Sequence, residues 1–505
     1  MSRPVAGAGM RHQVARFLER AQAQFQAAAY REAGDIAQRV LALDANNAEA
    51  YHLLGAIAHR EERFAEAEAL LDKAISLNRR SPYFRHSLGN VYRAQGKFEA
   101  AEAAYRQALK LDPGLSAAYL GLATALRTLG RSRDAVVYLE RYLQREPNDA
   151  EAYNELGLNY LELGRLDLAV EQLRAALRLN PAHKAARDNI ALVLLLAENF
   201  REGWPAWLRS LTELPFPHPS TATAPFEGRR VLIHGSMGVG DEIMYASCLP
   251  ALTPHAEEVT LHCDRRLAPL FERSFPSVRT VGVDRQGHTQ HVIGILAPDE
   301  IHIAGSFLPA YFPPNIERFA RRRSFLVADP AQVAEWRKRF DGLGTGLRIG
   351  LSWRGGADPV NRRQRSIPLA AWGSILAVRG VHFVNLQYGD VDGEIEEARL
   401  AVPINRWRDA NPLADLDFFA AQIAALDLVI SVDNTTVHMA GALGIATWAL
   451  LPKVPDWRWT MAGTTTHWYP SVRLLRQQEA GRWEGVMQEV ATRLESCVAA
   501  GLVDT

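Results

Sequence analysis

The sequence predicts a multidomain chain in which an all-α solenoid is followed by an α/β module of two parallel-sheet domains. Two observations indicate this. Small residues recur with a 34-residue period over the N-terminal part of the chain, and from about residue 229 short β-branched runs alternate with helical stretches. A length of 505 residues is too great for a single core, so several domains are expected.

Composition narrows the class of protein. The 57 basic residues balance 57 acidic ones, and a net charge of zero argues against a nucleic-acid partner or a membrane-surface polycation. Cys248, Cys263 and Cys497 lie far apart without metal-ligand spacing, which suits a reducing compartment. The N-terminus lacks a signal-peptide pattern, and no apolar run is long enough to cross a bilayer. We therefore expect a cytoplasmic protein without a membrane span.

The repeat is defined by three classes of position that share one period. Prolines recur at the positions that separate successive helix pairs, and glycines twelve residues before the small residues allow two helices to cross closely. Bulkier side chains such as Tyr92, Tyr105 and Tyr160 are expected to fill the space between pairs. The small residues are Ala33, Ala67, Ala101, Ala135, Ala169 and Gly203, the prolines Pro113, Pro147 and Pro181, and the glycines Gly55, Gly89 and Gly157.

This pattern resembles the tetratricopeptide repeat (TPR), in about five copies over residues 14–183. A sixth unit degenerates, and its second helix, at 199–211, contains a proline, so we interpret it as a capping half-repeat that completes an array over residues 1–212. Such an array is a scaffold in one interpretation and a concave groove for a protein partner in the other.

A segment at 213–228, rich in Pro, Ser and Thr, is the predicted linker. Seven strands are predicted after it, and strands that alternate with helices indicate βαβ units. Two sets, at 229–340 and 341–505, predict two facing Rossmann-like domains with a cleft between them. The predicted strands occupy residues 229–235, 259–263, 279–283, 347–353, 381–387, 426–432 and 447–451.

The first turn of this module runs from His234 to Glu242 and contains Gly238, Gly240 and Asp241. It does not match a dinucleotide fingerprint or a Walker loop. Two interpretations stay open: a structural turn in which Asp241 caps the helix, and a catalytic Asp241 beside a sugar or phosphate site.

The second domain offers polar residues at the ends of its strands. Arginines at 362, 363 and 365, followed by Ser366, suit a diphosphate, although a solvated charge run is the alternative. Gln387 ends a strand and is either a reader of a nucleobase edge or an ordinary polar residue. The pairs at 390/392 and 415/417 are aspartates that we expect to be loop or helix caps rather than metal ligands.

The stretch at 426–452 is the most informative of this half. An apolar strand ends in Asp433, and a helix begins at Asn434-Thr435-Thr436 and continues past His438. Unpaired N–H groups and the helix dipole make such a junction an anion site. His438 lies in the early turns of the helix and has either a structural or a functional role.

Three motifs, GVGDEIMYASCLPAL, SVDNTTVHMAGALG and WYPSVRLLRQ, together with the repeats, resemble the bacterial TPR glycosyltransferases. Their C-terminal halves are similar to the heptosyltransferases, which have the two-domain GT-B architecture. The resemblance implies Asp241 as general base and Arg365 as a contact of the donor phosphate. It also implies that the segment from Asp433 to His438 wraps the nucleotide diphosphate, although Thr435 stands where a glycine is common.

The implied reaction is an inverting, metal-independent sugar transfer from a nucleotide-sugar co-substrate, with no cofactor. The implied donor-binding residues are Gly238, Gly240, Arg365, Ser366, Gln387, Asp433, Asn434, Thr435, Thr436 and His438. The array would recruit the acceptor, and the resemblance implies a protein such as flagellin or another surface protein. The alternative is a non-catalytic TPR scaffold with a vestigial nucleotide-sugar-binding module.

Overall fold

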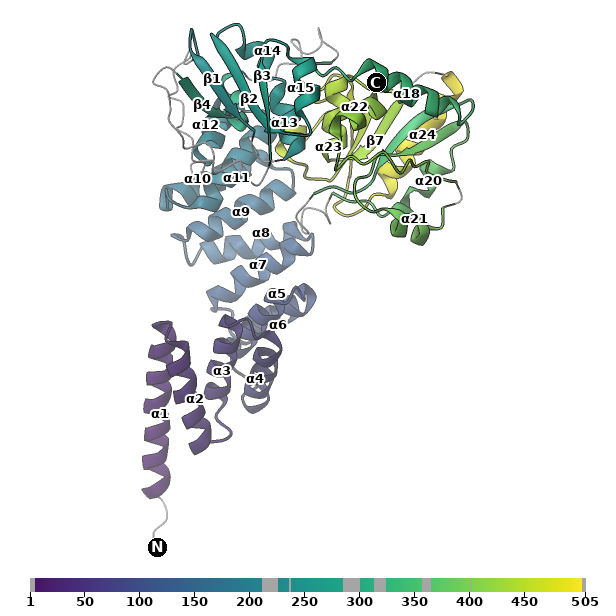
Figure 1. The fold of residues 1–505 in the computed structure, drawn as a ribbon. Coiled ribbons are helices and arrows are strands. Elements are labelled where there is room, and N and C mark those ends of the chain that lie inside the picture. The colour runs from purple at the N-terminus through teal and green to yellow at the C-terminus, as the bar shows by residue number, and fades with distance from the viewer. Residues whose placement is uncertain are drawn as a thin grey trace. The chain divides into compact units, whose positions relative to one another are not determined.

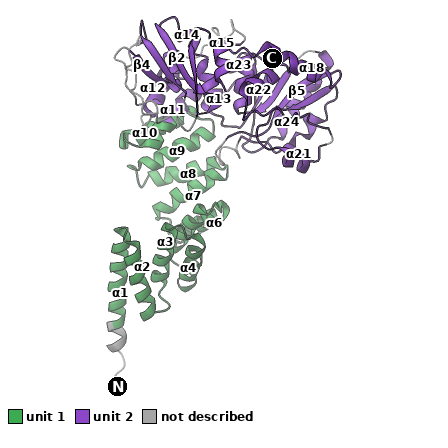
Figure 2. Ribbon diagram, viewed as in Figure 1, with its two compact units in different colours: residues 1–189 green, residues 190–505 purple. Residues whose placement is uncertain are grey.

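The computed structural model describes residues 5–210, 226–235, 238–284, 300–312, 324–356, 365–400 and 402–501. The chain divides into two compact units, residues 1–189 and 190–505 (Figure 2). Most of the predicted linker lies outside the described residues, as do the predicted arginines at 362 and 363.

The first unit consists of antiparallel helix pairs that stack one after another (Figure 1). The second helices of successive pairs begin 34 residues apart, so the period of the structure matches the one in the sequence. The helices are α1 (Val5–Gln26), α2 (Tyr30–Leu43), α3 (Ala48–Arg60), α4 (Phe64–Leu77), α5 (Pro82–Ala94), α6 (Phe98–Leu111), α7 (Ser116–Thr128), α8 (Ser132–Leu143), α9 (Ala150–Glu162) and α10 (Leu166–Leu179). A further pair, α11 (Lys184–Leu196) and α12 (Phe200–Ser210), follows.

The turn within each helix pair has one residue in the left-handed region of backbone space. These residues keep the 34-residue period and have φ between 58° and 74°. Glycine adopts this conformation freely, whereas a residue with a Cβ is strained there by roughly 1–2 kcal/mol. The residues are Ala28, Glu62, Gly96, Gly130, Gly164 and Glu198.

Close helix approach, predicted at the periodic small residues, is confirmed by the packing. The five periodic alanines from Ala33 to Ala169 have no exposed surface. A Cβ at Gly55 would lie 2.8 Å from Leu71, and one at Gly89 would lie 2.7 Å from the ring of Tyr105. Tyr105 is fully buried, and its hydroxyl donates to Asn90 Oδ1 at 2.7 Å.

The second unit contains two parallel sheets, each in a doubly wound order. The first sheet has the order β3-β2-β1-β4 and the second β6-β5-β7-β8-β9. The strands are β1 (Arg230–His234), β2 (Glu258–Asp264), β3 (Arg279–Val283), β4 (Glu300–Ala304), β5 (Leu347–Ser352), β6 (Val381–Asn385), β7 (Leu428–Val432), β8 (Thr447–Leu451) and β9 (Val472–Arg476). All pairings between them are parallel.

Helices alternate with these strands, as the sequence predicts (Figure 1). The α-helices are α13 (Val239–Ala246), α14 (Leu249–Leu252), α15 (Ala268–Ser274), α16 (Leu308–Tyr311), α18 (Pro330–Asp341), α20 (Gly373–Leu376), α21 (Asp392–Ala398), α22 (Leu416–Ala424), α23 (Thr435–Leu443) and α24 (Glu484–Ala500). Single 3₁₀ turns are η2 (Gly305–Phe307), η3 (Leu369–Trp372) and η4 (Trp457–Trp459). No described helix has both the length and the apolarity needed to span a bilayer.

The last helix of the repeat array, α12, belongs to the second unit. The sequence, in contrast, predicts the end of the array at residue 212. The reason is aromatic packing: the Trp204 ring meets Trp457 edge-on at 5.4 Å, and Trp204 is only 3% exposed. Gly203 is buried, as the period predicts. Pro205 lies inside the helix, which continues past it to Ser210. The degenerate repeat is therefore fused to the α/β unit through its own core.

Because Gly89 meets the ring of Tyr105, we expect Gly89→Ala to lower the free energy of unfolding of the helical unit by about 1–3 kcal/mol. The measurement is chemical denaturation of the full chain, followed by the helical circular dichroism signal. The matched control is Gly34→Ala, also in a helix, where the nearest atom to a Cβ is Ile57 Cδ1 at 3.9 Å. It should stabilise by about 0.5–1 kcal/mol through helix propensity. Equal shifts in the two variants would contradict the packing argument.

Candidate functional site

The candidate site lies at the carboxyl ends of the central strands of the two sheets. In each sheet the chain order reverses beside one central strand, between β1 and β4 and between β5 and β7. Ligands of doubly wound folds bind in the crevice outside the strand ends at such a switch point. Residues that follow β1, β5 and β7 therefore occupy the places where a ligand is expected.

Asp241 lies in the first turn of α13, directly after the β1 turn. One carboxylate oxygen, Oδ2, accepts the N–H of Gly238 at 2.8 Å, so Asp241 does cap the start of the helix. The other, Oδ1, pairs with the guanidinium of Arg458, which comes from the loop after β8. The residue thus combines the capping geometry with a position at the switch point of the first sheet, where its side chain is 17% exposed.

Asp241 is one end of a chain of alternating charges that we call the ionic chain: Asp241, Arg458, Asp456, Arg365 and Asp433. Arg458 Nη1 lies 2.5 Å from Asp456 Oδ1, and Arg365 Nη2 lies 3.2 Å from Asp456 Oδ2. Arg365 Nη1 lies 3.3 Å from Asp433 Oδ2, an ion pair without the alignment of a hydrogen bond. The ionic chain joins the first sheet's domain to three segments of the second.

Burial and pairing set the charges within the ionic chain. Burial raises the pKa of Asp433 above its usual value, and Arg365 only partly offsets this effect. Burial also acts to raise the pKa of Asp456, but Arg458 and Arg365 outweigh it, and the pKa of Asp456 falls. Three carboxyls thus face two guanidiniums, so an anionic ligand has to replace a carboxylate partner of an arginine.

Asn434 caps α23, and its side-chain amide holds the strand ends together. Its Oδ1 accepts the N–H of Thr436 at 2.9 Å, and its Nδ2 donates to Ser352 Oγ at 2.7 Å and to the Arg354 carbonyl at 3.0 Å. Thr435 is partly exposed at the start of the helix. The Thr436 hydroxyl is buried, with no hydrogen-bond partner among the described residues. The start of α23 thus carries the partly exposed side chain of Thr435 and the buried, unpaired hydroxyl of Thr436.

His438 lies at the contact between α13 and α23. It is 5% exposed, its Nδ1 lies 2.8 Å from the Tyr469 hydroxyl, and its ring lies 5.3 Å from that of Trp459. A Cβ at Gly240 would lie 2.8 Å from His438 Cδ2, so the glycine permits the two helices to touch. Burial lowers the pKa of His438 to about 3, and Arg458 acts in the same direction. The imidazole is therefore neutral at ordinary pH.

Gln387 and Ser366, two further residues predicted to bind the nucleotide-sugar donor, hold the loop after β5 in place. Gln387 Oε1 accepts from Ser352 Oγ at 3.1 Å and from the backbone N–H groups of Trp353 and Arg354 at 2.9 and 2.8 Å. Gln387 is 1% exposed, and its Nε2 has no hydrogen-bond partner among the described residues. Ser366 Oγ lies 3.4 Å from the N–H of Gly355. Both side chains are thus engaged in holding the loop.

The structure adds residues that the sequence analysis missed. Asp456 and Arg458 form the centre of the ionic chain, and Tyr469 and Trp459 enclose His438. One signal was available: in Asp456-Trp457-Arg458-Trp459 two opposite charges alternate with two tryptophans soon after an apolar strand. Such charges are rarely surrounded by large aromatics unless they are paired.

Metal-site candidates in the sequence have other roles. Asp415 caps α22 by accepting the N–H groups of Asp417 and Phe418, at 3.0 and 2.9 Å. Asp417 is paired with Arg273, and Asp390 Oδ1 accepts the N–H of Asp392 at 3.1 Å. The predicted capping roles are confirmed for Asp415 and Asp390. Across the described ranges, no group of three His, Cys, Asp or Glu residues is arranged to hold a metal ion.

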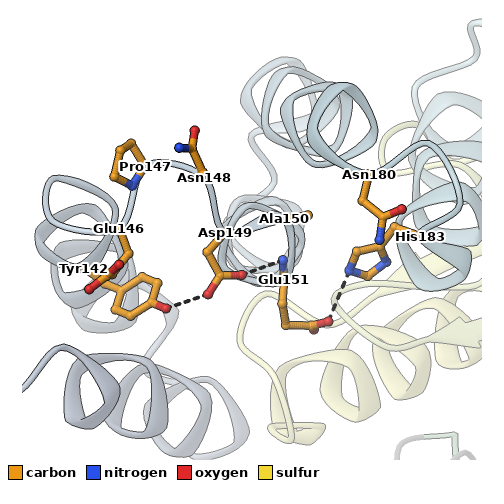
Figure 3. A pocket seen from close by; sticks show the side chains of 9 residues that line it. All are labelled: Tyr142, Glu146, Pro147, Asn148, Asp149, Ala150, Glu151, Asn180 and His183. Atoms are coloured by element: carbon orange, nitrogen blue, oxygen red, sulfur yellow. Dashed lines mark hydrogen bonds and ion pairs between the residues drawn. The ribbon is translucent and has the colours of Figure 1, made fainter.

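A polar hollow of about 530 Å³ lies within the helical unit (Figure 3). The Tyr142 hydroxyl donates to Asp149 Oδ2 at 2.5 Å, and His183 Nε2 lies 3.1 Å from Glu151 Oε2. Asp149 also caps α9 through the N–H groups of Glu151 and Ala152. Four of the polar residues that line the hollow, Tyr142, Asp149, Glu151 and His183, are thus engaged with one another or with the helix end.

Comparison with known proteins identifies the helical unit. Three family models described as tetratricopeptide repeat match residues 46–114, 92–157 and 150–183. The N-terminal half carries TPR repeats. A curated relative, Protein FlbA of Caulobacter vibrioides, is 36% identical over 332 residues, which cover 61% of this chain and 55% of FlbA. The chain therefore spans about half the length of that relative.

Several solved structures, a TPR protein among them, are similar to about a third of this chain. YrrB, described as a TPR protein with an unusual peptide-binding site, is 23% identical, covers 35% of this chain and 93% of its own, and has a TM-score of 0.32. PilF of Pseudomonas aeruginosa is 15% identical, with 40% and 91% covered and a TM-score of 0.37. MamA is 23% identical, with 33% and 92% covered and a TM-score of 0.30.

Because the pKa of His438 is about 3 in the folded protein and about 6.5 when unfolded, the unfolded chain binds a proton first as the pH falls. Titration of His438 therefore leaves the free energy of unfolding unchanged above pH 6.5. Below pH 6.5 it lowers this free energy by ~1.4 kcal/mol per pH unit, until about pH 3. We expect His438→Asn, whose amide can still meet the Tyr469 hydroxyl, to flatten the stability profile of the second unit between pH 6.5 and 5. Denaturation at several pH values measures this, and an unchanged slope would show that His438 is already charged in the folded state.

Proposed function

We propose that the chain is an inverting GT-B glycosyltransferase that moves a sugar from a nucleotide-activated donor to an acceptor hydroxyl. One observation supports this most: Asp241, in the helix after β1, pairs with Arg458, and the ionic chain links this pair through Asp456 to Arg365 and to Asp433 at the start of α23. A carboxylate opposite two guanidiniums and a helix N-terminus matches the needs of a base and a departing diphosphate.

The proposed reaction is a single displacement at the anomeric carbon. The acceptor oxygen forms a bond to that carbon as the bond from carbon to the diphosphate oxygen breaks. Asp241 takes the proton of the acceptor hydroxyl, and the nucleoside diphosphate leaves with the bonding electron pair. Arg365, Arg458 and the N–H group of Thr435 at the start of α23 stabilise the negative charge that develops on the diphosphate.

This mechanism requires the ionic chain to open when the donor binds. Arg365 is the more accessible arginine, with a side chain 25% exposed against 9% for Arg458. A diphosphate that contacts Arg365 competes with Asp433 and Asp456, and one that also reaches Arg458 competes with Asp241. The second exchange frees the base, so donor binding activates Asp241.

The TPR array is the proposed acceptor-recruiting part. TPR repeats suggest binding of a protein partner, and a protein acceptor such as flagellin or another surface protein is consistent with this arrangement. The similarity to FlbA supports a shared architecture over the aligned part.

The second candidate function is a non-catalytic TPR scaffold with a vestigial nucleotide-sugar-binding module. The engagement of Asp241 favours it, because both carboxylate oxygens already have partners, the Gly238 N–H and Arg458. The two functions differ in turnover, and the next two experiments separate them.

Thermal unfolding across a panel of nucleoside diphosphates and nucleotide sugars tests the donor site. We expect one nucleobase family to raise the melting temperature of the wild type, because a ligand that binds only the folded state stabilises it. Arg365→Ala should lose that increase. Arg339→Ala is the control, since Arg339 also pairs with two carboxylates, Glu335 and Asp409, outside the ionic chain. No stabilisation by any member of the panel would contradict the donor site.

Removing the base tests turnover. Asp241→Asn should abolish nucleotide release from the nucleotide sugar that stabilises the wild type, and leave binding of that sugar donor intact. A stability loss of about 1–3 kcal/mol should accompany it, because Arg458 loses one charged partner. Asp329→Asn is the control: Asp329 caps α18 by accepting two N–H groups. It should cost stability of similar sign and leave turnover unchanged. Equal turnover in Asp241→Asn and wild type would exclude Asp241 as the base, and a wild type without turnover would favour the scaffold.

A further inference from the structure

The segment from Asp456 to Gly463 holds the centre of the ionic chain in one conformation. Asp456 caps the 3₁₀ turn η4, since its Oδ1 accepts the N–H of Arg458 at 3.3 Å. Arg458 is 8% exposed and points back to pair with Asp456 and with Asp241. The direction of the guanidinium thus depends on the backbone of this turn.

The turn is strained and clamped. Thr460 has φ 56° and ψ 174°, a left-handed conformation that residues with a Cβ rarely adopt and that costs ~1–3 kcal/mol. Arg476 of β9 donates to the carbonyl oxygens of Trp459 and Thr460 at 2.6 and 3.0 Å. It also donates to those of Ala462 and Gly463 at 3.2 and 3.0 Å. Strain held by such contacts is a feature of sites that pre-organise a side chain.

The opposite side of the turn is covered by α12, the last helix of the degenerate repeat. The ring of Trp457 lies 5.4 Å from those of both Trp204 and Trp207, and its other neighbour Trp468 is 6.0 Å away. Arg458 Cζ lies 5.1 Å from the centre of the Trp457 ring, a cation–π contact. Trp457 is therefore held between α12 and the arginine of the ionic chain.

A second contact fixes the same helix pair to the loop that follows. Glu198, in the turn before α12, lies 2.8 Å from His467 Nε2, and Phe200 at the start of α12 packs against the His467 ring at 5.3 Å. Trp468 and Tyr469 come directly after His467, and Tyr469 contacts His438. Both loop segments that line the crevice after β8 are thus attached to α12.

We infer that α12 positions Arg458 for the transfer reaction through Trp457, so that the last helix of the repeat region is a working part of the transfer site. This inference rests on the proposed function. Trp204 and Trp207 are positioning residues, because they act through Trp457 and do not touch the substrate. Loss of their contact lets Trp457 turn, and the guanidinium then loses its alignment with Asp241 and Asp456.

The test uses the full chain with Trp207→Ala and the conservative Trp207→Phe. Trp207 is half-buried, so both variants should fold. The probe is the nucleoside diphosphate that stabilises the wild type most in a panel of UDP, GDP, ADP, CDP and TDP. Isothermal titration well below the melting temperature should show an affinity about tenfold weaker in Trp207→Ala and an intermediate value in Trp207→Phe. Hydrogen exchange in the peptide that contains residues 456–463 should be faster in Trp207→Ala.

The control variant is Trp336→Phe. Trp336 is fully buried against Trp407 and Phe418, and Arg339 lies 4.7 Å from its ring, so it repeats the tryptophan–arginine contact away from the crevice. It should lower stability and leave the affinity unchanged. If the wild type binds the diphosphate and Trp207→Ala binds it with the same affinity, the inference is wrong and the proposed function stands. A wild type that binds none of the five diphosphates would overturn both.

Discussion

The pairing of Arg458 with Asp241 and Asp456 is the interaction on which the second unit depends most. A guanidinium that is 8% exposed loses most of its hydration, and only close carboxylates offset that loss. The partners come from α13 and from the turn at η4, so the charge is balanced only when the domains of the two sheets lie together. The contact of Gly240 with His438 depends on the same closed arrangement. One buried cation thus links domain closure, helix packing and the electrostatics of the crevice.

Much of the fold could be predicted from the sequence, because its signals are local and repeated. The 34-residue period predicted the helix pairs, and β-branched runs predicted seven of the described strands. Strands β4 and β9 were missed because polar residues such as Glu300, His302 and Arg473 interrupt their apolar pattern. The boundary at residue 212 differs from the compact units because aromatic packing of Trp204 cannot be inferred from periodicity.

The candidate site was predicted less completely, for a physical reason. Asp241 lies in the first turn of a helix and Asp433 directly follows a strand, and the topology of parallel sheets brings such residues together. Arg365 was predicted from the run of arginines that it ends. Arg458 and Asp456 come from an irregular turn, and their place depends on Thr460, Arg476 and α12 rather than on any repeated pattern. Gln387 and Asn434 were predicted as ligand contacts, but most of their hydrogen bonds join strand ends to loops. A sequence does not distinguish a polar group that faces a ligand from one that holds a loop.

The left-handed turn residues of the helix pairs have a consequence for how the array opens. Glycine holds this position at Gly96, Gly130 and Gly164, whereas Ala28, Glu62 and Glu198 hold it near the two ends of the series. In a repeat array each pair contributes its own stability plus the interfaces with its neighbours. The strain of a Cβ in this conformation lowers the stability of the first two pairs relative to the central ones, whereas the pair that contains Glu198 is also held by its packing against the α/β unit. Local opening of the array is therefore expected to be graded, with the amides of the central pairs exchanging more slowly than those of the first two.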